Sequence, residues 1–154
     1  MNKIIEDIEL RTDLAKVTMK SVLDKPGMAG QIFSSLGEAG FNVEMIAQTG
    51  TIKDRCDISF TVKEGEVDMV LQHLRNKLVA VTATGVLVDK NVAMLTIFDK
   101  ELANTPGIAG KIFSILAQVR INIDMISASL TTLSCLVPKD RANDAMDAIK
   151  AEMG

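Results

Sequence analysis

The sequence predicts an α+β fold built from two copies of one small unit, each with the order strand, helix, strand, strand, helix, strand. The first observation is a repeat: residues 25–36 return as residues 105–116 at an offset of 80, with eight of the twelve positions identical. The same offset places residues 42–46 on residues 122–126. The second observation is that apolar residues switch between a period of two and a helical period within each copy. These features indicate a duplication.

The first copy begins with a strand at 15–22, where apolar and polar residues alternate. A turn at 24–27 contains Pro-Gly and leads into a helix at 28–39, whose apolar residues recur at helical spacing. Gly40 suits the end of that helix. The remaining predicted elements are strands at 41–49 and 56–62, a helix marked by Val67, Val70, Leu71, Leu74 and Leu78, and a strand at 79–88.

The second copy lacks a fourth strand in its own segment. Its predicted elements are strands at 92–98, 121–130 and 133–137 and helices at 108–119 and 141–153. The segment 4–10, which precedes the first copy, has the alternation of a strand. We therefore expect the first copy to be inserted into the second. The domains are then 11–90 and 4–10 plus 91–154, each of the split βαβ, ferredoxin-like type.

Composition excludes several classes of partner. The formal net charge is −3 and the sequence pI is about 5.2, so no basic field is available for nucleic acid or an anionic membrane. The chain has five Phe and no Trp or Tyr, which leaves no platform for stacking bases. Residues 1–10 are too acidic for a signal peptide and the apolar runs are short. We expect a cytoplasmic protein with free Cys56 and Cys135.

The chain offers little for catalysis. Its single histidine, His73, lies at an expected polar position of a helix. No Walker-type loop or Gly-x-Gly-x-x-Gly occurs, and no Cys-x-x-Cys or His-rich spacing suggests a metal site. We expect no catalytic residue, no metal and no cofactor, and therefore no enzyme activity in the chain alone.

The turns that lead into the two similar helices are the candidate binding sites. The first N–H groups of a helix lack internal partners and attract a carboxylate. Asp24, just before one helix, could meet an ammonium group, so a free amino acid matches both charges. The alternative is a tight Pro-Gly turn with hydrated N–H groups. Asn42, Asn122 and Gln48 likewise either cap local backbone or offer an amide to a ligand.

Several short motifs in fixed order resemble the regulatory region of aspartate kinase, which is a tandem of ACT domains. In the first copy these are Asp24-Lys25-Pro26-Gly27-Met28-Ala29, Asn42-Val43-Glu44-Met45-Ile46 with Gln48, and Asp57-Ile58-Ser59-Phe60-Thr61-Val62. In the second they are Pro106-Gly107-Ile108-Ala109, Ile121-Asn122-Ile123-Asp124-Met125-Ile126-Ser127 and Leu133-Ser134-Cys135-Leu136-Val137. The resemblance covers essentially the whole chain. It implies an inserted ACT pair that senses lysine or threonine and exerts feedback on a separate kinase domain, and the length resembles a free β subunit.

The resemblance also implies an effector site between ACT units, across a homodimer. The implied residues are Asp24, Gly27, Met28, Ala29 and Gln48 from the first copy and Ala109, Asn122 and Ile123 from the second. Leu130 stands where the family has an acidic residue, which favours threonine over lysine. Two functions remain open: a regulatory subunit of aspartate kinase with a kinase catalytic subunit as partner, or an autonomous ACT pair that senses an amino acid and regulates another partner.

Overall fold

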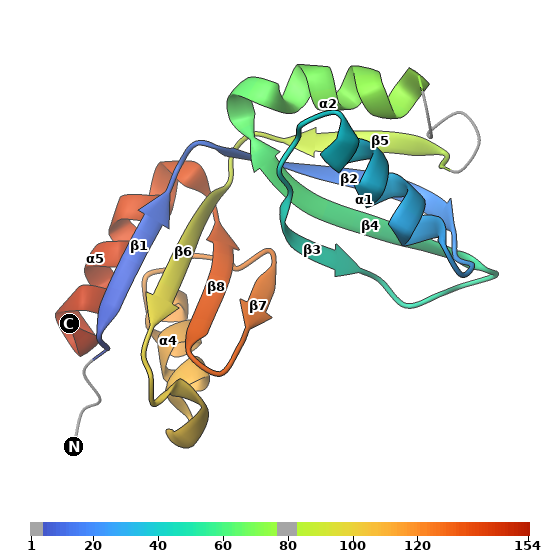
Figure 1. Cartoon of the computed structure of the whole chain (residues 1–154). Helices are drawn as coiled ribbons and strands as arrows, with labels where there is room; N and C mark the ends of the chain where they lie inside the picture. The colour runs from blue at the N-terminus through green and yellow to red at the C-terminus, as the bar shows by residue number, and fades with distance from the viewer. Residues whose placement is uncertain (1–4, 77–82) are drawn as a thin grey trace. The chain divides into compact units, whose positions relative to one another are not determined.

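The computed structural model describes residues 5–76 and 83–154 (Figure 1). The chain divides into two compact units. One is Asp13–Lys90, which we call the inserted unit. The other combines the described residues up to Thr12 with Asn91–Gly154, and we call it the split unit. Each unit has its own sheet and its own apolar core.

The sheet of the inserted unit is antiparallel, with the strand order β3-β4-β2-β5. Its central strands are long and alternate between buried and half-buried side chains, which is what a sheet with one covered face requires. The bounds are β2 (Leu14–Leu23), β3 (Glu44–Gln48), β4 (Arg55–Lys63) and β5 (Gly85–Asp89).

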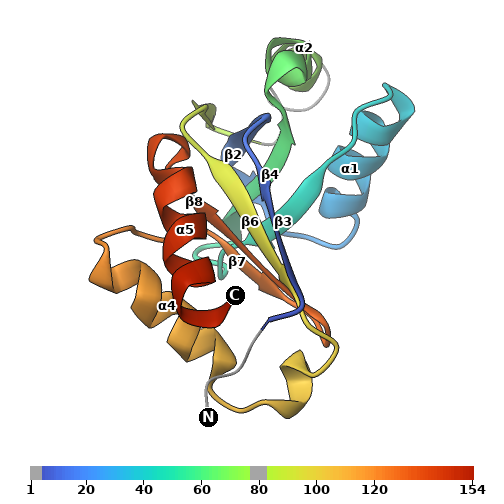
Figure 2. The same cartoon turned by 90° about the vertical axis from the view of Figure 1, so that its left-hand side faces the viewer.

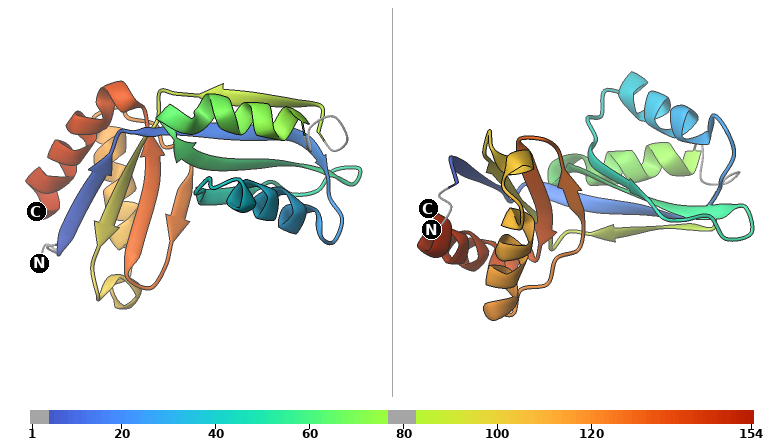
Figure 3. Two further views of the ribbon diagram at one scale, coloured as in Figure 1. Left: turned by 45° about the horizontal axis from the view of Figure 1, so that its top comes forward. Right: turned by 90° about the horizontal axis from the view of Figure 1, so that it is seen from below.

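Two helices cover one face of this sheet, α1 (Met28–Glu38) and α2 (Val67–Leu74), the latter preceded by the short 3-10 helix η1 (Glu64–Glu66). The right-hand view of Figure 3 shows both helices on the same side of the strands. The core between helices and sheet includes an edge-to-face pair of Phe33 and Phe60, with ring centroids 5.4 Å apart. His73 is half-buried rather than on the surface, and its Nε2 lies 2.7 Å from Ser35 Oγ, so this side chain links the two helices.

The split unit repeats this architecture. Its antiparallel sheet has the order β1-β6-β8-β7, and α4 and α5 lie on one side of it (Figure 2). The bounds are β1 (Asp7–Arg11), β6 (Ala93–Phe98), η3 (Leu102–Asn104), α4 (Ile108–Gln118), β7 (Ile126–Ala128), β8 (Thr132–Val137), η4 (Lys139–Arg141) and α5 (Ala142–Met153).

The N-terminal strand completes the sheet of the split unit. β1 pairs with β6, with Ile8 opposite Ile97 and Leu10 opposite Leu95. β1 therefore occupies beside β6 the place that β5 occupies beside β2. The inserted topology is confirmed. The strand begins at Asp7, later than the predicted 4–10. Ile5 is buried in the same core, but its N–H donates to Met153 O at 3.0 Å and not to β6.

Other boundaries differ from the sequence prediction, and helix termination explains two of them. The predicted strands at 41–49 and 121–130 begin only at Glu44 and Ile126. The N–H of Phe41 donates to Leu36 O, and the N–H of Ile121 donates to Leu116 O, so both residues close the preceding helix. The predicted strand at 79–88 is observed as Gly85–Asp89, while Leu78 and residues 79–82 lie outside the described residues.

Candidate functional site

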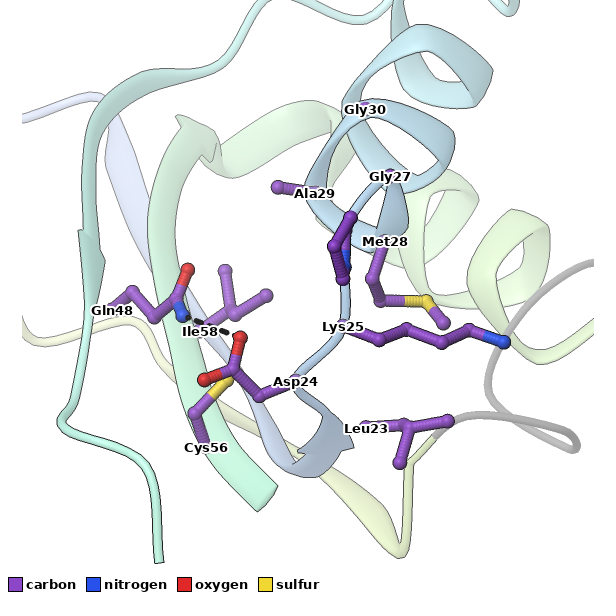
Figure 4. A pocket seen from close by; sticks show the side chains of 11 residues that line it. Leu23, Asp24, Lys25, Gly27, Met28, Ala29, Gly30, Gln48, Cys56 and Ile58 are labelled. Carbon is purple, nitrogen blue, oxygen red and sulfur yellow. Dashed lines mark hydrogen bonds between the residues drawn. The ribbon is translucent and has the colours of Figure 1, made fainter. Parts of the chain in front are cut away.

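A pocket of about 380 Å³ lies where β2 of the inserted unit turns into α1 (Figure 4). It is formed by the turn, by the first residues of the helix, by the end of β3 and by the start of β4. The lining residues are Leu23, Asp24, Lys25, Pro26, Gly27, Met28, Ala29, Gly30, Gln48, Cys56 and Ile58.

The Pro-Gly turn sets the direction of α1. Gly27 has φ of 91°, in the left-handed region, where a residue with a Cβ is strained. The N–H of Met28 donates to Lys25 O at 3.2 Å, and the N–H of Gln31 donates to Gly27 O at 3.0 Å. Met28, Ala29 and Gly30 of the first turn line the pocket, at the positive end of this eleven-residue helix. This is a geometry that favours a bound carboxylate.

Asp24 places a carboxylate at the rim of the same pocket. The Gln48 side-chain amide donates to Asp24 Oδ1 at 3.3 Å, and the Thr51 hydroxyl donates to Asp24 Oδ2. The backbone N–H of Asp24 donates to Asp54 O at 2.8 Å. Figure 4 shows the Asp24 and Gln48 side chains meeting, while the Lys25 side chain extends away from them. The carboxylate is thus held by the last residue of β3 and by the segment that joins β3 to β4.

The floor of the pocket is apolar. Met28 is 5% exposed, Cys56 is 4% exposed and Ile58 is 2% exposed. Burial, together with the negative charges of Asp24 and Asp57, raises the pKa of the Cys56 thiol, so the thiol stays neutral. The pocket therefore combines a helix N-terminus, a single carboxylate and a small apolar floor. This arrangement matches the carboxylate, the ammonium group and a short side chain of a free amino acid.

The matching position of the split unit has a different pocket. It measures about 240 Å³ and includes Gly107 (φ 83°), Ile108 and Ala109. At the offset of 80, Asn104 replaces Asp24 and Ala128 replaces Gln48. The longer loop before α4 forms η3, and Leu102 from this helix is buried in the unit's core. This pocket has no carboxylate among its lining residues.

The structure brings together five of the eight site residues suggested by the sequence. Asp24, Gly27, Met28, Ala29 and Gln48 all line the pocket of the inserted unit.

The other three predicted residues lie in the split unit. Ala109 is in the first turn of α4, whereas exposed Asn122 and half-buried Ile123 follow the C-terminal end of that helix. The unit therefore does not place Ala109 in one pocket with Asn122 and Ile123.

The sequence reasoning missed Thr51, Cys56 and Ile58. Thr51 lies in a polar connection that gives no periodic signal. It reaches Asp24 because Lys53 and Asp54, with φ of 52° and 61°, make a tight turn closed by the Ile52–Arg55 bridge. Cys56 and Ile58 are apolar strand residues in an alternating pattern, which predicts core and says nothing of a pocket. Both cysteines are free, as predicted, and both are buried.

Within residues 5–76 and 83–154, no group of three or more His, Cys, Asp or Glu side chains is arranged to hold a metal ion. The helices of this described part are also too short or too polar to cross a membrane.

Comparison with known proteins shows the family of the chain. A family profile for the ACT domain matches residues 19–78 and 95–153. An aspartokinase of Thermus thermophilus is 30% identical over 151 residues, and an aspartokinase of Helicobacter pylori is 32% identical over 148 residues. The alignments cover 97% and 96% of this chain but only 37% and 36% of those proteins. The chain thus spans about a third of the curated relatives it matches.

Solved structures of other proteins align with this chain over nearly its full length. The regulatory subunit of aspartate kinase from Thermus thermophilus, in a ligand-free form, aligns with a TM-score of 0.91 and 28% identity, covering 99% of this chain and 100% of that one. A chain of a structure of aspartokinase alpha and beta subunits aligns with a TM-score of 0.87 and 30% identity, covering 96% and 97%. The resemblance inferred from the motifs is confirmed. The chain is a tandem pair of ACT domains and belongs to the ACT domain family.

Proposed function

We propose that this protein is a regulatory subunit that binds a free amino acid and thereby controls an aspartate kinase. The observation that carries the proposal is the pocket of the inserted unit, where the carboxylate of Asp24 faces the N-terminus of α1. An amino acid presents the two opposite charges that these groups attract. The regulatory subunits of aspartate kinase that align along the whole chain support this role.

Threonine is the ligand that the lining favours. Asp24 is the one acidic residue among the eleven lining residues. In this proposal its carboxylate pairs with the α-ammonium group of the ligand. A lysine ligand brings a second ammonium group, which needs another anion. The floor of Met28, Cys56 and Ile58 suits a methyl group instead.

We also propose that the site is completed in a homodimer. β3 and β7 are edge strands of their sheets, and each carries an exposed isoleucine, Ile46 (52%) and Ile126 (54%). Exposed edges with apolar side chains favour pairing with another copy. In the dimer, the backbone of Ile123 and the side chain of Asn122 from the partner copy face the pocket. This proposal leaves Ala109 outside the effector site.

The proposed second partner is a separate kinase catalytic subunit in the cytoplasm. The aligned structure described as aspartokinase alpha and beta subunits is the precedent, and the curated relatives are about three times as long as this chain. The chain itself is proposed to have no kinase activity. Aspartate- and ATP-dependent turnover by the purified 154-residue chain would contradict this.

Titration calorimetry with L-threonine, L-lysine and the other amino acids tests the ligand. We expect threonine to bind the wild type. Sedimentation with and without threonine tests the dimer, since one chain has a mass of 16.6 kDa. Two further measurements distinguish a kinase subunit from an autonomous ACT pair. A kinase subunit should copurify with an aspartate kinase catalytic chain, and threonine should then inhibit the activity of that kinase. Binding of threonine without any effect on such a kinase would favour the autonomous ACT pair.

A further inference from the structure

β2 contains a β-bulge three residues before Asp24. Met19 pairs with Ile58 and Val22 pairs with Cys56, so Lys20 and Ser21 together stand opposite the single residue Asp57. Ser21 has φ of 57°, which an L-residue with a side chain rarely adopts. A shift of one residue moves every following side chain to the opposite face of a sheet. The bulge therefore decides which face of the sheet Val22 and Leu23, the last two strand residues before Asp24, present.

The side chain of Asp57 holds this bulge. Lys20 Nζ donates to Asp57 Oδ2 at 2.5 Å, and the backbone N–H of Ser21 donates to Asp57 Oδ1 at 2.9 Å. Both bulge residues are thus bonded to one carboxylate. The Lys20 side chain is 44% exposed and the Asp57 side chain is 28% exposed, so solvent screens this ion pair.

The backbone of Asp57 also holds the end of β3. The N–H of Asp57 donates to Thr49 Oγ1 at 2.9 Å, and the N–H of Thr49 donates to Asp57 O at 3.0 Å. Thr49 directly follows Gln48, whose amide bonds to Asp24. One residue therefore connects the strand that leads to Asp24 with the strand that carries Gln48.

The split unit provides a natural comparison. The hydrogen-bonded pair Thr18 and Ser59 in the inserted unit matches the pair Thr96 and Ser134 in the split unit. Two residues before Ser134 stands Thr132, in the place of Asp57. β6 and β8 pair there without a register shift. The inserted unit, whose pocket contains Asp24, thus has the bulge and the Asp57 carboxylate. The matching strands of the split unit, β6 and β8, have neither.

We propose that Asp57 is a positioning residue of the amino-acid site: through the bonds of its carboxylate to Lys20 and Ser21 it sets the side chain of Asp24 against that of Gln48, whose strand end is held by the backbone of residue 57. Asp57 is outside the pocket lining, so it acts on the ligand through these neighbours. The effect of Asp57 on ligand binding rests on the proposed function. The positioning itself is a property of the protein without ligand.

The first measurement therefore uses the ligand-free chain. The side-chain amide resonances of Gln48, followed by ¹⁵N-correlated NMR, report its hydrogen bond to Asp24. We expect them to move in Asp57→Ala in the same direction as in Asp24→Ala, and to stay in place in the matched control Thr132→Ala. Wild-type resonance positions in folded Asp57→Ala would overturn the proposal.

The second measurement is threonine affinity by calorimetry. We expect Asp57→Ala to weaken binding about tenfold, the effect of losing well-placed charged hydrogen bonds. Asp57→Asn keeps an oxygen for the Ser21 N–H and should recover part of the affinity, and Lys20→Met should lose less than Asp57→Ala. Wild-type affinity in folded Asp57→Ala overturns the proposal.

Two outcomes keep the test decisive. If Asp57→Ala does not fold, the NMR and calorimetry measurements are made on Asp57→Asn and Lys20→Met instead. Wild-type Gln48 resonances and wild-type threonine affinity in these two variants would overturn the proposal. If the wild type binds no amino acid, the proposed function fails, while the Gln48 resonances still decide the positioning.

Discussion

The side-chain amide of Gln48 donates a hydrogen bond to the carboxylate of Asp24 across 24 residues of sequence, at 3.3 Å. Thr51 donates to the other oxygen of the same carboxylate. Asp24 is thereby held at the pocket rim rather than extended into solvent. This geometry makes Asp24 the residue whose loss should affect ligand binding most directly.

The first prediction concerns this carboxylate. Asp24→Ala should weaken threonine binding by about tenfold or more, because a charged hydrogen bond contributes roughly 1.5–3 kcal/mol. Calorimetry of the purified protein measures the change. Asn104→Ala, at the matching position of the split unit, is the control and should bind with wild-type affinity. Equal weakening in both variants would argue against the inserted-unit pocket as the site.

The second prediction concerns pH and stability. The pKa of Asp57 lies below its ordinary value of 3.8, mainly because Lys20 bonds to its carboxylate and also because the Ser21 N–H does. The unfolded state therefore takes up the proton at a higher pH than the folded state. The stability that this group contributes is present above its unfolded pKa and is lost as pH falls through the folded pKa.

The free energy of unfolding, measured in urea from about pH 5 to about pH 3, should therefore fall more steeply in the wild type than in Asp57→Asn. Asp57→Asn leaves every other acidic residue in place, so the difference between the two curves reports on residue 57. Parallel curves for the two proteins would show that the Lys20–Asp57 pair adds nothing measurable to stability.

The third prediction uses the two cysteines as a footprint of the pocket. Cys56 lines the pocket, whereas Cys135 is fully buried among the strands of the split unit and burial raises its pKa to about 11. Alkylation by iodoacetamide, followed by mass spectrometry, should modify Cys56 faster than Cys135, since the thiolate reacts and must be reached. Threonine should slow the modification of Cys56 and leave Cys135 unaffected. Faster reaction at Cys135 would contradict the assignment of the open pocket.

The fourth prediction concerns the separate cores. Leu36 and Leu116 occupy matching positions of α1 and α4, and both are fully buried. Each Leu→Ala substitution should cost about 2–5 kcal/mol in its own unit, because a buried cavity replaces packed methyl groups. Hydrogen exchange resolved by residue should show lost protection in the sheet of the substituted unit first. Equal loss in both units for either variant would mean that they unfold together.

The fifth prediction concerns β1. Deletion of residues 1–10 removes Ile8 and Leu10, which lie opposite Ile97 and Leu95 and pack against the core of the split unit. β6 then becomes an open edge. Hydrogen exchange should therefore increase in β6 and β8 more than in β2 and β4. The reverse order would be incompatible with the observed pairing.

The sequence alone determined the duplication, the order of elements and the inserted topology. These follow from local signals: an exact offset between two Pro-Gly-x-Ala-Gly segments, a switch in apolar period, and an alternating N-terminal segment with no sheet of its own. Local signals also placed Asp24 beside a helix start. The predicted starts of β3 and β7 were too early, because the N–H groups of Phe41 and Ile121 bond back to the preceding helices, which apolar periodicity does not reveal.

Only the tertiary structure decided how the site is assembled. The polar segment 52–55 indicates a hairpin connection, and the structure has a tight turn there whose two central residues, Lys53 and Asp54, have positive φ. The sequence does not show that this turn brings Thr51 to Asp24. Cys56 and Ile58 have the pattern of ordinary core residues, and whether an apolar strand residue faces the core or a pocket depends on what the neighbouring loop leaves open. The bulge at Lys20 and Ser21 depends on a carboxylate 36 residues away from Ser21. Such long-range bonds fix the face of a strand, and they arise only when the strands meet.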